Sequence, residues 1–265
     1  MSNIINFIVL LILIYILFRY IDKYLNNRAY LDNIEKFQNN IFFLNKNQLL
    51  TILISDKDNY YNRFYKPDLK ARNITNIEEY FTNIKYSVSE PTNEIKEKVT
   101  DCINKADLFF KNIKYNYFNG IDNNKLIWKI GFIKNNLYEG GLPHTRSDII
   151  ILNIDKVKYS NKNNLIKTLI HEKVHIYQKK YPEKMQKYLN IHQFKKIKKR
   201  DEFDNIRANP DLDNYIYQDK NNNTYKALYN NNISSVEDIV YYPENNQSFE
   251  HPFEKMAIEI ENIYT

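Results

Sequence analysis

The chain has 265 residues and a formal net charge of +6, with 43% hydrophobic and 26% charged residues. This length and composition allow a sizeable core and exclude a wholly disordered protein. Its single cysteine, Cys102, excludes an intrachain disulfide and with it the class of small disulfide-stapled secreted domains.

The first segment along the chain is an apolar run at the amino end. Ile4–Phe18 carries no charge, and its extension to Ile21 approaches the roughly 20 residues that cross a bilayer core. A cleaved signal peptide would need a positive amino-terminal region and small residues at a cleavage site. Only Met-Ser-Asn precedes this run, and bulky residues follow it. We therefore expect residues 1–22 to form a single transmembrane anchor, with residues 4–21 in the lipid bilayer.

The charges around this anchor predict its orientation. Arg19, Lys23 and Arg28 follow the apolar run and no charged side chain precedes it, so the positive-inside rule places the body on the cytosolic side or on a viral membrane. The single cysteine agrees with a reducing compartment. Four Asn-x-Ser/Thr sequons point the other way, but in a chain so rich in Asn such sequons arise by chance (Asn73, Asn222, Asn232, Asn246).

Residues 23–124 are expected to be mainly helical and to form a stalk or a cover. Apolar residues at helical spacing predict a helix over about 31–50, and residues 55–76 are rich in polar residues and predict an irregular segment. Pro91 opens a second helix, in which Thr92 is the expected cap and Cys102 a small buried residue.

Residues 125–265 alternate between strand and helix patterns and predict one α+β domain. Two strands are expected, at Lys125–Lys134 and at Ile149–Ile154, separated by a turn at Gly140-Gly141. Helices are expected over Asn161–Lys180, Pro182–Lys199 and Pro252–Tyr264, with an irregular segment over Asp201–Asn232.

A basic run, Lys195–Arg200, falls in the second of these helices. Its simplest interpretation is a solvated helix face or loop. Contact with lipid headgroups or with nucleic acid is the alternative. No nucleic-acid-binding motif accompanies the run, and we expect no nucleic-acid partner.

The motif that indicates chemistry is His171-Glu172-Lys173-Val174-His175, which matches H-E-x-x-H. Residues four apart share one face of a helix, so both imidazoles can bind one metal ion. Glu172 lies about 100° around the helix from His171, within reach of a metal-bound water. Imidazole ligands and an open coordination position favour Zn²⁺, with Glu172 as the general base. The alternative is a helix with two surface histidines and an incidental glutamate.

With this motif the sequence resembles the zincin metallopeptidases, and more narrowly those whose third ligand is a glutamate on a later helix. The resemblance covers roughly residues 125–264. It implies a small mixed sheet packed on the active-site helix. It also implies that the strand before that helix holds an extended peptide substrate, and Ile149–Ile154 is the expected edge strand.

The third ligand must come from outside the motif. The shorter family spacing falls on Lys195, whereas Pro252-Phe253-Glu254-Lys255-Met256-Ala257 resembles the Pro-x-Glu-x-x-Ala helix start of glutamate-zincins. We therefore predict zinc ligands at His171, His175 and Glu254. The small Ala257 lies one turn later, where two helices would approach closely. The alternative third ligands are Glu250, His251, Asp201, Glu202, Asp204 and His144, and an acid favoured by the helix dipole is the non-ligand interpretation of Glu254.

A tetrahedral oxyanion needs a hydrogen-bond donor opposite the metal. The candidates are Tyr215, Tyr217, Arg207 and His144, of which we predict Tyr217 and His144 as catalytic residues beside Glu172.

These patterns predict a membrane-anchored zinc metalloendopeptidase-like hydrolase that acts on a protein or peptide. The alternatives are a structural protein with the same fold and no turnover, for example in the particle of a large DNA virus, and a membrane-surface module that uses the basic run. The sequence indicates neither the substrate nor the oligomeric state.

Overall fold

The computed structural model describes residues 40–200, 203, 205–243 and 249–264. The chain divides into two compact units, residues 1–42 and 43–265. The predicted anchor at residues 1–22 lies outside the described residues, and in the described part no helix is both long and apolar enough to span a membrane. The domain boundary expected between residues 124 and 125 does not coincide with this division.

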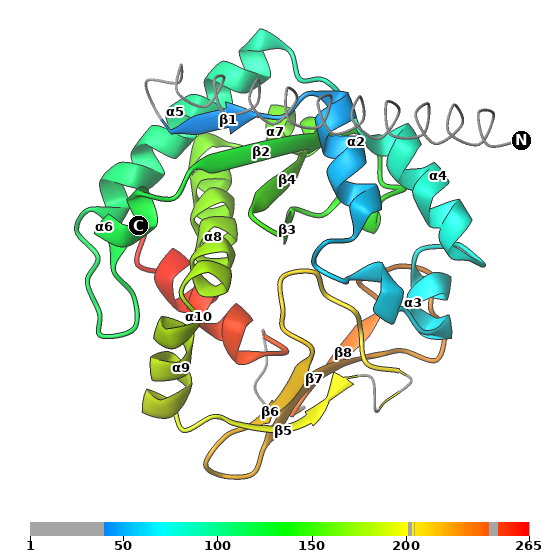
Figure 1. Cartoon of the computed structure of the whole chain (residues 1–265), viewed down its shortest axis with the longest axis vertical. Coiled ribbons are helices and arrows are strands. Elements are labelled where there is room, and N and C mark those ends of the chain that lie inside the picture. Colours follow the sequence, from blue (N-terminus) through cyan, green and yellow to red (C-terminus); the bar gives the residue numbers. More distant parts are fainter. Residues whose placement is uncertain (1–39, 201–202, 204, 244–248, 265) are drawn as a thin grey trace, which may run out of the picture. The chain divides into compact units, whose positions relative to one another are not determined.

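Unit 43–265 has an α+β fold, as predicted, with helices and two small sheets in its described part (Figure 1). In the first sheet, β2 (Trp128–Ile133) runs parallel to β4 (Ile149–Asn153), and β3 (His144–Arg146) pairs with β4 in the antiparallel sense. The prediction that Ile149–Ile154 is an edge strand is therefore wrong. β4 lies between β2 and β3 with all five residues buried, and β3 is the edge.

The helices before the first sheet fill the segment that the sequence described only in part. They are α2 (Lys46–Ser55), α3 (Lys66–Ala71), α4 (Ile77–Ser87), α5 (Asn93–Phe110) and α6 (Gly120–Asn124). The predicted helix over 31–50 is wrong at its centre, because β1 (Ile41–Phe43) precedes α2. The segment expected to be irregular contains α3 and a 3₁₀ turn at Tyr61–Arg63. α5 begins as predicted, with the Thr92 side chain accepting from the Ile95 amide.

After β4 the chain forms α7 (Ile154–Tyr159), α8 (Lys162–Lys180) and α9 (Pro182–Ile191), and near its end α10 (Pro252–Glu261). α8 begins where the Asn161 side chain accepts from the Asn164 amide, and Pro182 prevents its continuation. α8 packs against α5 on one side and α10 on another, and it also contacts β3 and β4 (Figure 1). The motif helix is therefore almost enclosed, as its long run of buried residues shows.

The second sheet corrects two predictions. The expected helix over Pro182–Lys199 ends at Ile191, and Gln193, at φ 57°, turns the chain into β5 (Lys195–Lys199). The segment expected to be irregular contains β6 (Tyr215–Gln218) and β7 (Thr224–Tyr229), which with β5 and β8 (Ile239–Tyr242) form an antiparallel sheet. Helical periodicity misled here because β5 is exposed on every residue, so its sequence carries no alternation.

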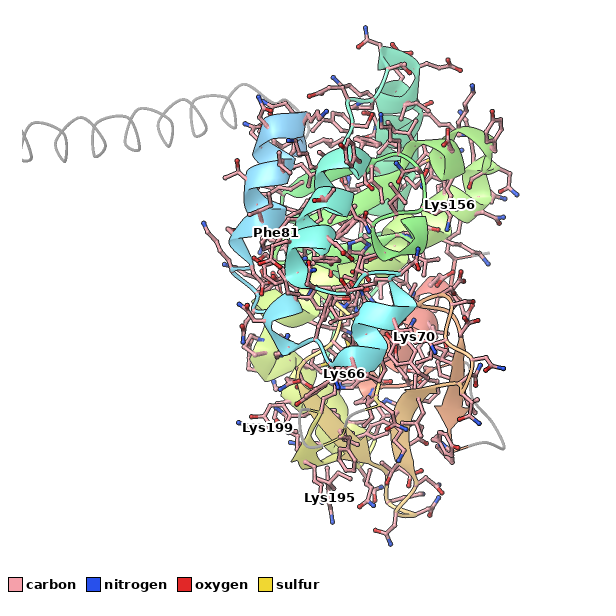
Figure 2. The ribbon with its side chains drawn as sticks, turned by 90° about the vertical axis from the view of Figure 1, so that its right-hand side faces the viewer. Lys66, Lys70, Phe81, Lys156, Lys195 and Lys199 are labelled. Carbon is pink, nitrogen blue, oxygen red and sulfur yellow. The ribbon has the colours of Figure 1, made fainter. Side chains whose placement is uncertain are left out.

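The basic run belongs to this edge of the second sheet. Lys195 and Lys199 reach outward from β5 (Figure 2), whereas Arg200 is buried and its Nη2 donates to Asp68 at 2.9 Å. Lys196 pairs with Asp213 at 3.3 Å. The run is thus a solvated strand that ends in a buried arginine.

Candidate metal centre

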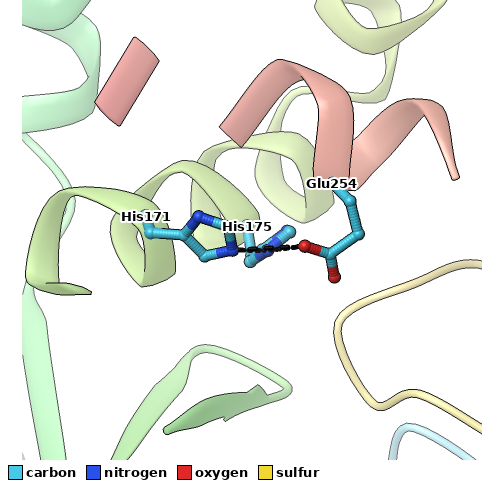
Figure 3. A group of neighbouring side chains, drawn as sticks. All are labelled: His171, His175 and Glu254. Atoms are coloured by element: carbon cyan, nitrogen blue, oxygen red, sulfur yellow. Dashed lines mark hydrogen bonds and ion pairs between the residues drawn. The ribbon is translucent and has the colours of Figure 1, made fainter. Parts of the chain in front are cut away.

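Three side chains from two helices meet beside α8. His171 and His175 lie one turn apart on α8, and Glu254 lies in the first turn of α10 (Figure 3). The two Nε2 atoms are 3.1 Å apart. Oε2 of Glu254 lies 3.2 Å from Nε2 of His171 and 3.8 Å from Nε2 of His175. The structure therefore brings together the three residues predicted as ligands.

These separations fit a metal ion by size and by chemistry. Ligands bound to a tetrahedral zinc at 2.0–2.1 Å lie about 3.3–3.4 Å from one another. Two imidazole nitrogens and one carboxylate oxygen are a donor set that Zn²⁺ accepts, with a fourth position left open. Three acceptor atoms at such distances also need a cation among them, either a proton or a metal ion.

The ring of His175 is fixed through its other nitrogen. Nδ1 lies 2.9 Å from Oε1 of Gln178, while Nε2 of the same Gln178 amide donates to the Phe253 carbonyl at 2.9 Å. Because that carbonyl can only accept, the amide orientation is set, and Nδ1 of His175 must carry the proton that Oε1 accepts. The lone pair of His175 Nε2 is thereby left for the cluster.

His171 has an equivalent support from the other helix. Its Nδ1 lies 3.1 Å from Oε2 of Glu261 on α10, so Nδ1–H donates to a carboxylate and Nε2 faces His175 and Glu254. Glu254 is itself held, because Asn209 Nδ2 donates to Oε1 at 3.0 Å and leaves Oε2 for the cluster. Sequence reasoning did not identify Glu261, Gln178 or Asn209. Glu261 lies seven residues after Glu254, on the same helix face, and Gln178 lies three after His175, so helical spacing could have indicated both.

Without a metal ion, a proton is the cation in this cluster. Burial lowers the pKa of His171, but its hydrogen bonds to Glu254 and Glu261 outweigh burial and hold the pKa well above its usual range. Burial alone would raise the pKa of Glu254, yet the neighbouring His175 and His171 lower it. Burial lowers the pKa of His175, which keeps that ring neutral, the form that binds metals.

Glu172 lies next to the cluster with one oxygen unpartnered. Its side chain is buried, and Oε2 has no hydrogen-bond partner among the described residues. Glu172 lines a cavity of about 270 Å³ together with His171 and Glu254. Burial raises the pKa of this carboxyl well above its ordinary value, and the nearby Asp211 carboxylate adds to the shift.

The opposite face of α8 fixes the rotation of the motif. Lys173 is fully buried, and its Nζ donates to the carbonyls of Leu126 and Ile127 at 2.6 and 3.1 Å and lies 4.3 Å from the centre of the Trp128 ring. Burial lowers the pKa of Lys173 to about 7. These contacts tie α8 to the start of β2 and keep both histidines turned toward α10.

His144, predicted as catalytic, lines the same cavity but has no free ring nitrogen. Its Nδ1 donates to the Leu142 carbonyl at 2.9 Å, so Nε2 must accept, and it does so from the Tyr138 hydroxyl at 3.2 Å. That hydroxyl in turn accepts from Arg146. Both ring nitrogens of His144 are therefore engaged by the protein, and neither has a proton to donate into the cavity.

Tyr217, the other predicted donor, lies away from this cavity. Its hydroxyl donates to Asp213 at 2.7 Å, and its ring lines a second cavity of about 370 Å³ beyond Gln178. Tyr215 pairs with Lys199 in the second sheet. Arg207 does line the first cavity, but its guanidinium is engaged with Glu250.

Two of the residues considered as alternative third ligands, Glu250 and His251, have other partners in the structure. Glu250 is engaged by Arg207 and by Asn209, and His251 caps α10 by accepting from the Phe253 amide. Asp201, Glu202 and Asp204 lie outside the described residues.

No protein-family model matches the chain, and no curated protein or solved structure is significantly similar to it.

Proposed function

We propose that this protein is a zinc-dependent hydrolase of peptide bonds. His171, His175 and Glu254 hold the metal, and Glu172 is the general base. Residues 4–21 anchor the protein in a lipid bilayer, with the body on the cytosolic side or on a viral membrane. The substrate is a protein or peptide.

One observation carries the proposal: Glu172, whose Oε2 has no hydrogen-bond partner among the described residues, lines the same cavity as His171 and Glu254. A structural metal site has no need of a buried, unpaired carboxylate, whose burial costs about 1–3 kcal/mol. A site that activates water needs such a group close to the metal. The geometry therefore favours catalysis over the non-catalytic alternative.

The residues of the chain have separate roles in this proposal. Bound zinc supplies a Lewis acid that lowers the pKa of a coordinated water to about 7. The Glu172 carboxylate accepts a proton from that water, and its burial keeps bulk solvent from competing for the oxygen. Gln178 and Glu261 hold the two imidazoles in the tautomers that leave both Nε2 atoms unprotonated.

The arrangement of elements adds support from resemblance. A mixed sheet next to the H-E-x-x-H helix, followed by a helix with a ligand-like glutamate, is the arrangement that the resemblance to glutamate-zincins implies. The basic strand β5 gives the membrane-surface alternative no comparable support, because Lys196 is paired with Asp213 and Arg200 is buried.

The decisive experiment uses Glu172→Gln in the full-length protein in detergent micelles. Zinc content and cleavage of a peptide library are measured side by side. We expect stoichiometric zinc in both forms and a 10²- to 10⁴-fold loss of kcat/KM in the variant, the usual range for a lost general base.

Glu183→Gln is the matched control, because Glu183 is exposed on α9 and the chemical change is the same. It should leave both quantities unchanged. Stoichiometric zinc with no cleavage of any peptide by the unaltered protein would instead favour the structural alternative. Equal cleavage by the unaltered protein and by Glu172→Gln would rule out the proposed base.

A further inference from the structure

The edge strand β3 offers hydrogen-bonding groups at one residue only. Ser147 and Asp148 form a two-residue turn between β3 and β4, so Arg146 and Ile149 are the hydrogen-bonded closing pair of this hairpin. Pairs alternate along antiparallel strands, which makes Thr145 and Ile150 a pair without mutual hydrogen bonds. The N–H and C=O of Thr145 therefore point away from β4, toward the place where another extended chain would add.

That place is already occupied by two side chains. Oδ1 of Asp211 accepts from the Thr145 amide and from its hydroxyl, both at 2.6 Å. Nζ of Lys179 donates to the Thr145 carbonyl at 3.2 Å and to its hydroxyl at 2.6 Å. We call Asp211 and Lys179 the strand cap. An extended peptide gains affinity by adding to a sheet edge through backbone hydrogen bonds, and the strand cap takes both groups that would make them.

The segment that carries Asp211 is fastened along its length. The backbone of Ala208 donates to Asp68 at 2.8 Å and accepts from Arg72 at 3.2 Å. The Pro210 carbonyl accepts from Lys179 at 3.1 Å. Further contacts hold its remaining polar residues: Arg207 to Glu250, Asn209 to Glu254, and Asp213 to His251 and Tyr217. This many hydrogen bonds and ion pairs, several of them buried, indicate that the segment is a fixed wall of the site rather than a lid.

The cavity beside the candidate metal ligands is small. The cavity lined by His171, Glu254 and Glu172 has a volume of about 270 Å³, and Pro210 and Asp211 are part of its lining. Pockets for drug-sized molecules have volumes of about 300–1,000 Å³. The cavity therefore has room for a short peptide segment beside the metal, and its wall is the segment that covers β3.

From these observations we infer that the strand cap is a specificity element, which restricts the metal centre to short peptides and peptide chain ends. Internal segments of an extended polypeptide are excluded because they cannot pair with Thr145. The inference rests on the proposed function and narrows its substrate class.

The test measures peptide binding without turnover, in the zinc-loaded, full-length Glu172→Gln protein. A labelled tripeptide and a labelled dodecapeptide with blocked ends, built around the same central sequence, are titrated by fluorescence anisotropy. We expect the dodecapeptide to bind no more tightly than the tripeptide. Adding Asp211→Ala should increase the affinity for the dodecapeptide about tenfold relative to the affinity for the tripeptide, the value of one or two new backbone hydrogen bonds.

Lys179→Met is the second variant, in case Asp211→Ala does not fold, and it should act in the same direction by freeing the Thr145 carbonyl. Asp219→Ala is the matched control, because Asp219 holds a turn at Asn221 and Asn223 in the same way and lines no part of the cavity. It should change neither affinity.

Three other outcomes count against the inference. Tenfold tighter binding of the dodecapeptide with the strand cap intact would overturn it alone, since the metal centre would then accept extended chains. No gain in affinity in either cap variant would also overturn it alone. If neither peptide binds and the protein with Glu172 intact cleaves no peptide, the proposed function fails and the inference fails with it.

Discussion

α8 and α10 both contribute to the candidate metal centre, but they position their side chains differently. On α8, His171 and His175 are placed by the helix itself, one turn apart, with His175 fully buried. On α10, Glu254 and Glu261 each reach across to His171 on the other helix, at 3.2 and 3.1 Å. The geometry of the α8 half is local, whereas that of the α10 half exists only when the two helices are docked.

This difference shows where the centre is vulnerable. Lys173 and the buried stripe hold α8 to the sheet and to α5, independently of the metal donors. The donor of α10 depends on Asn209, from a distant loop, and on the docking of its own helix. We therefore expect substitutions on the α10 side to change metal affinity while the fold stays intact, and the following predictions test this in order of decreasing effect.

The largest effect is expected from Glu254→Gln. Removing the one charged donor should lower zinc affinity by more than about 100-fold, beyond the 10- to 100-fold range typical of residues that only support ligands. Competition with a chelating dye measures the affinity. Glu259→Gln, the same change on α10 at a side chain bonded to Lys255 and Tyr188, is the control and should have no effect. Unchanged affinity in Glu254→Gln would move the third ligand elsewhere.

A smaller effect is expected from the two residues that orient the imidazoles. Gln178→Leu and Glu261→Ala should each lower zinc affinity about 10- to 100-fold. The effect of Gln178→Leu should be the larger, because Gln178 also joins α8 to the Phe253 carbonyl of α10. Gln186→Leu on the exposed face of α9 is the control. Equal affinities for all three variants would show that the ring orientations do not depend on these bonds.

The smallest effect is expected from Asn209→Ala. It removes the bond to Oε1 of Glu254, and the loss of one hydrogen bond corresponds to about a 3- to 10-fold weaker zinc affinity. Asn221→Ala, in the turn between β6 and β7, is the control. A loss as large as that of Glu254→Gln would show that the loop, more than α10, fixes the third donor.

The contrast between α8 and α10 also explains what the sequence could predict. The H-E-x-x-H spacing is local, so helical geometry alone predicts that His171 and His175 share a face. The position of Glu254 depends on how two helices pack, and only resemblance to a family indicated it. The bond from Asn209 depends on an irregular loop, for which neither spacing nor periodicity gives a signal.

The errors in the fold have similar causes. The five residues Lys195–Lys199 were expected in a helix, but the strand is exposed on both faces, so no alternation reveals it. Ile149–Ile154 was correctly expected to be a strand but wrongly placed at an edge. A continuous apolar run is the pattern of an interior strand, since both of its faces are covered. His144 was predicted as catalytic from its residue type alone; in the structure its ring nitrogens lie at hydrogen-bond distance from the Leu142 carbonyl and the Tyr138 hydroxyl.

The docking of α10 on α8 has a consequence for how the protein would respond to metal supply. Apolar contacts already join α10 to α8, about eighty residues earlier in the chain, because α10 buries four apolar side chains: Phe253, Met256, Ala257 and Ile260. Folding therefore already offsets the entropy lost when the chain between the two helices is closed into a loop. A metal ion would bind reversibly between two helices that are packed together without it. Its binding free energy would add to the unfolding free energy by mass action, so chelation would lower the melting temperature without unfolding the protein. Metal availability could then switch the site on and off in a chain that stays folded throughout.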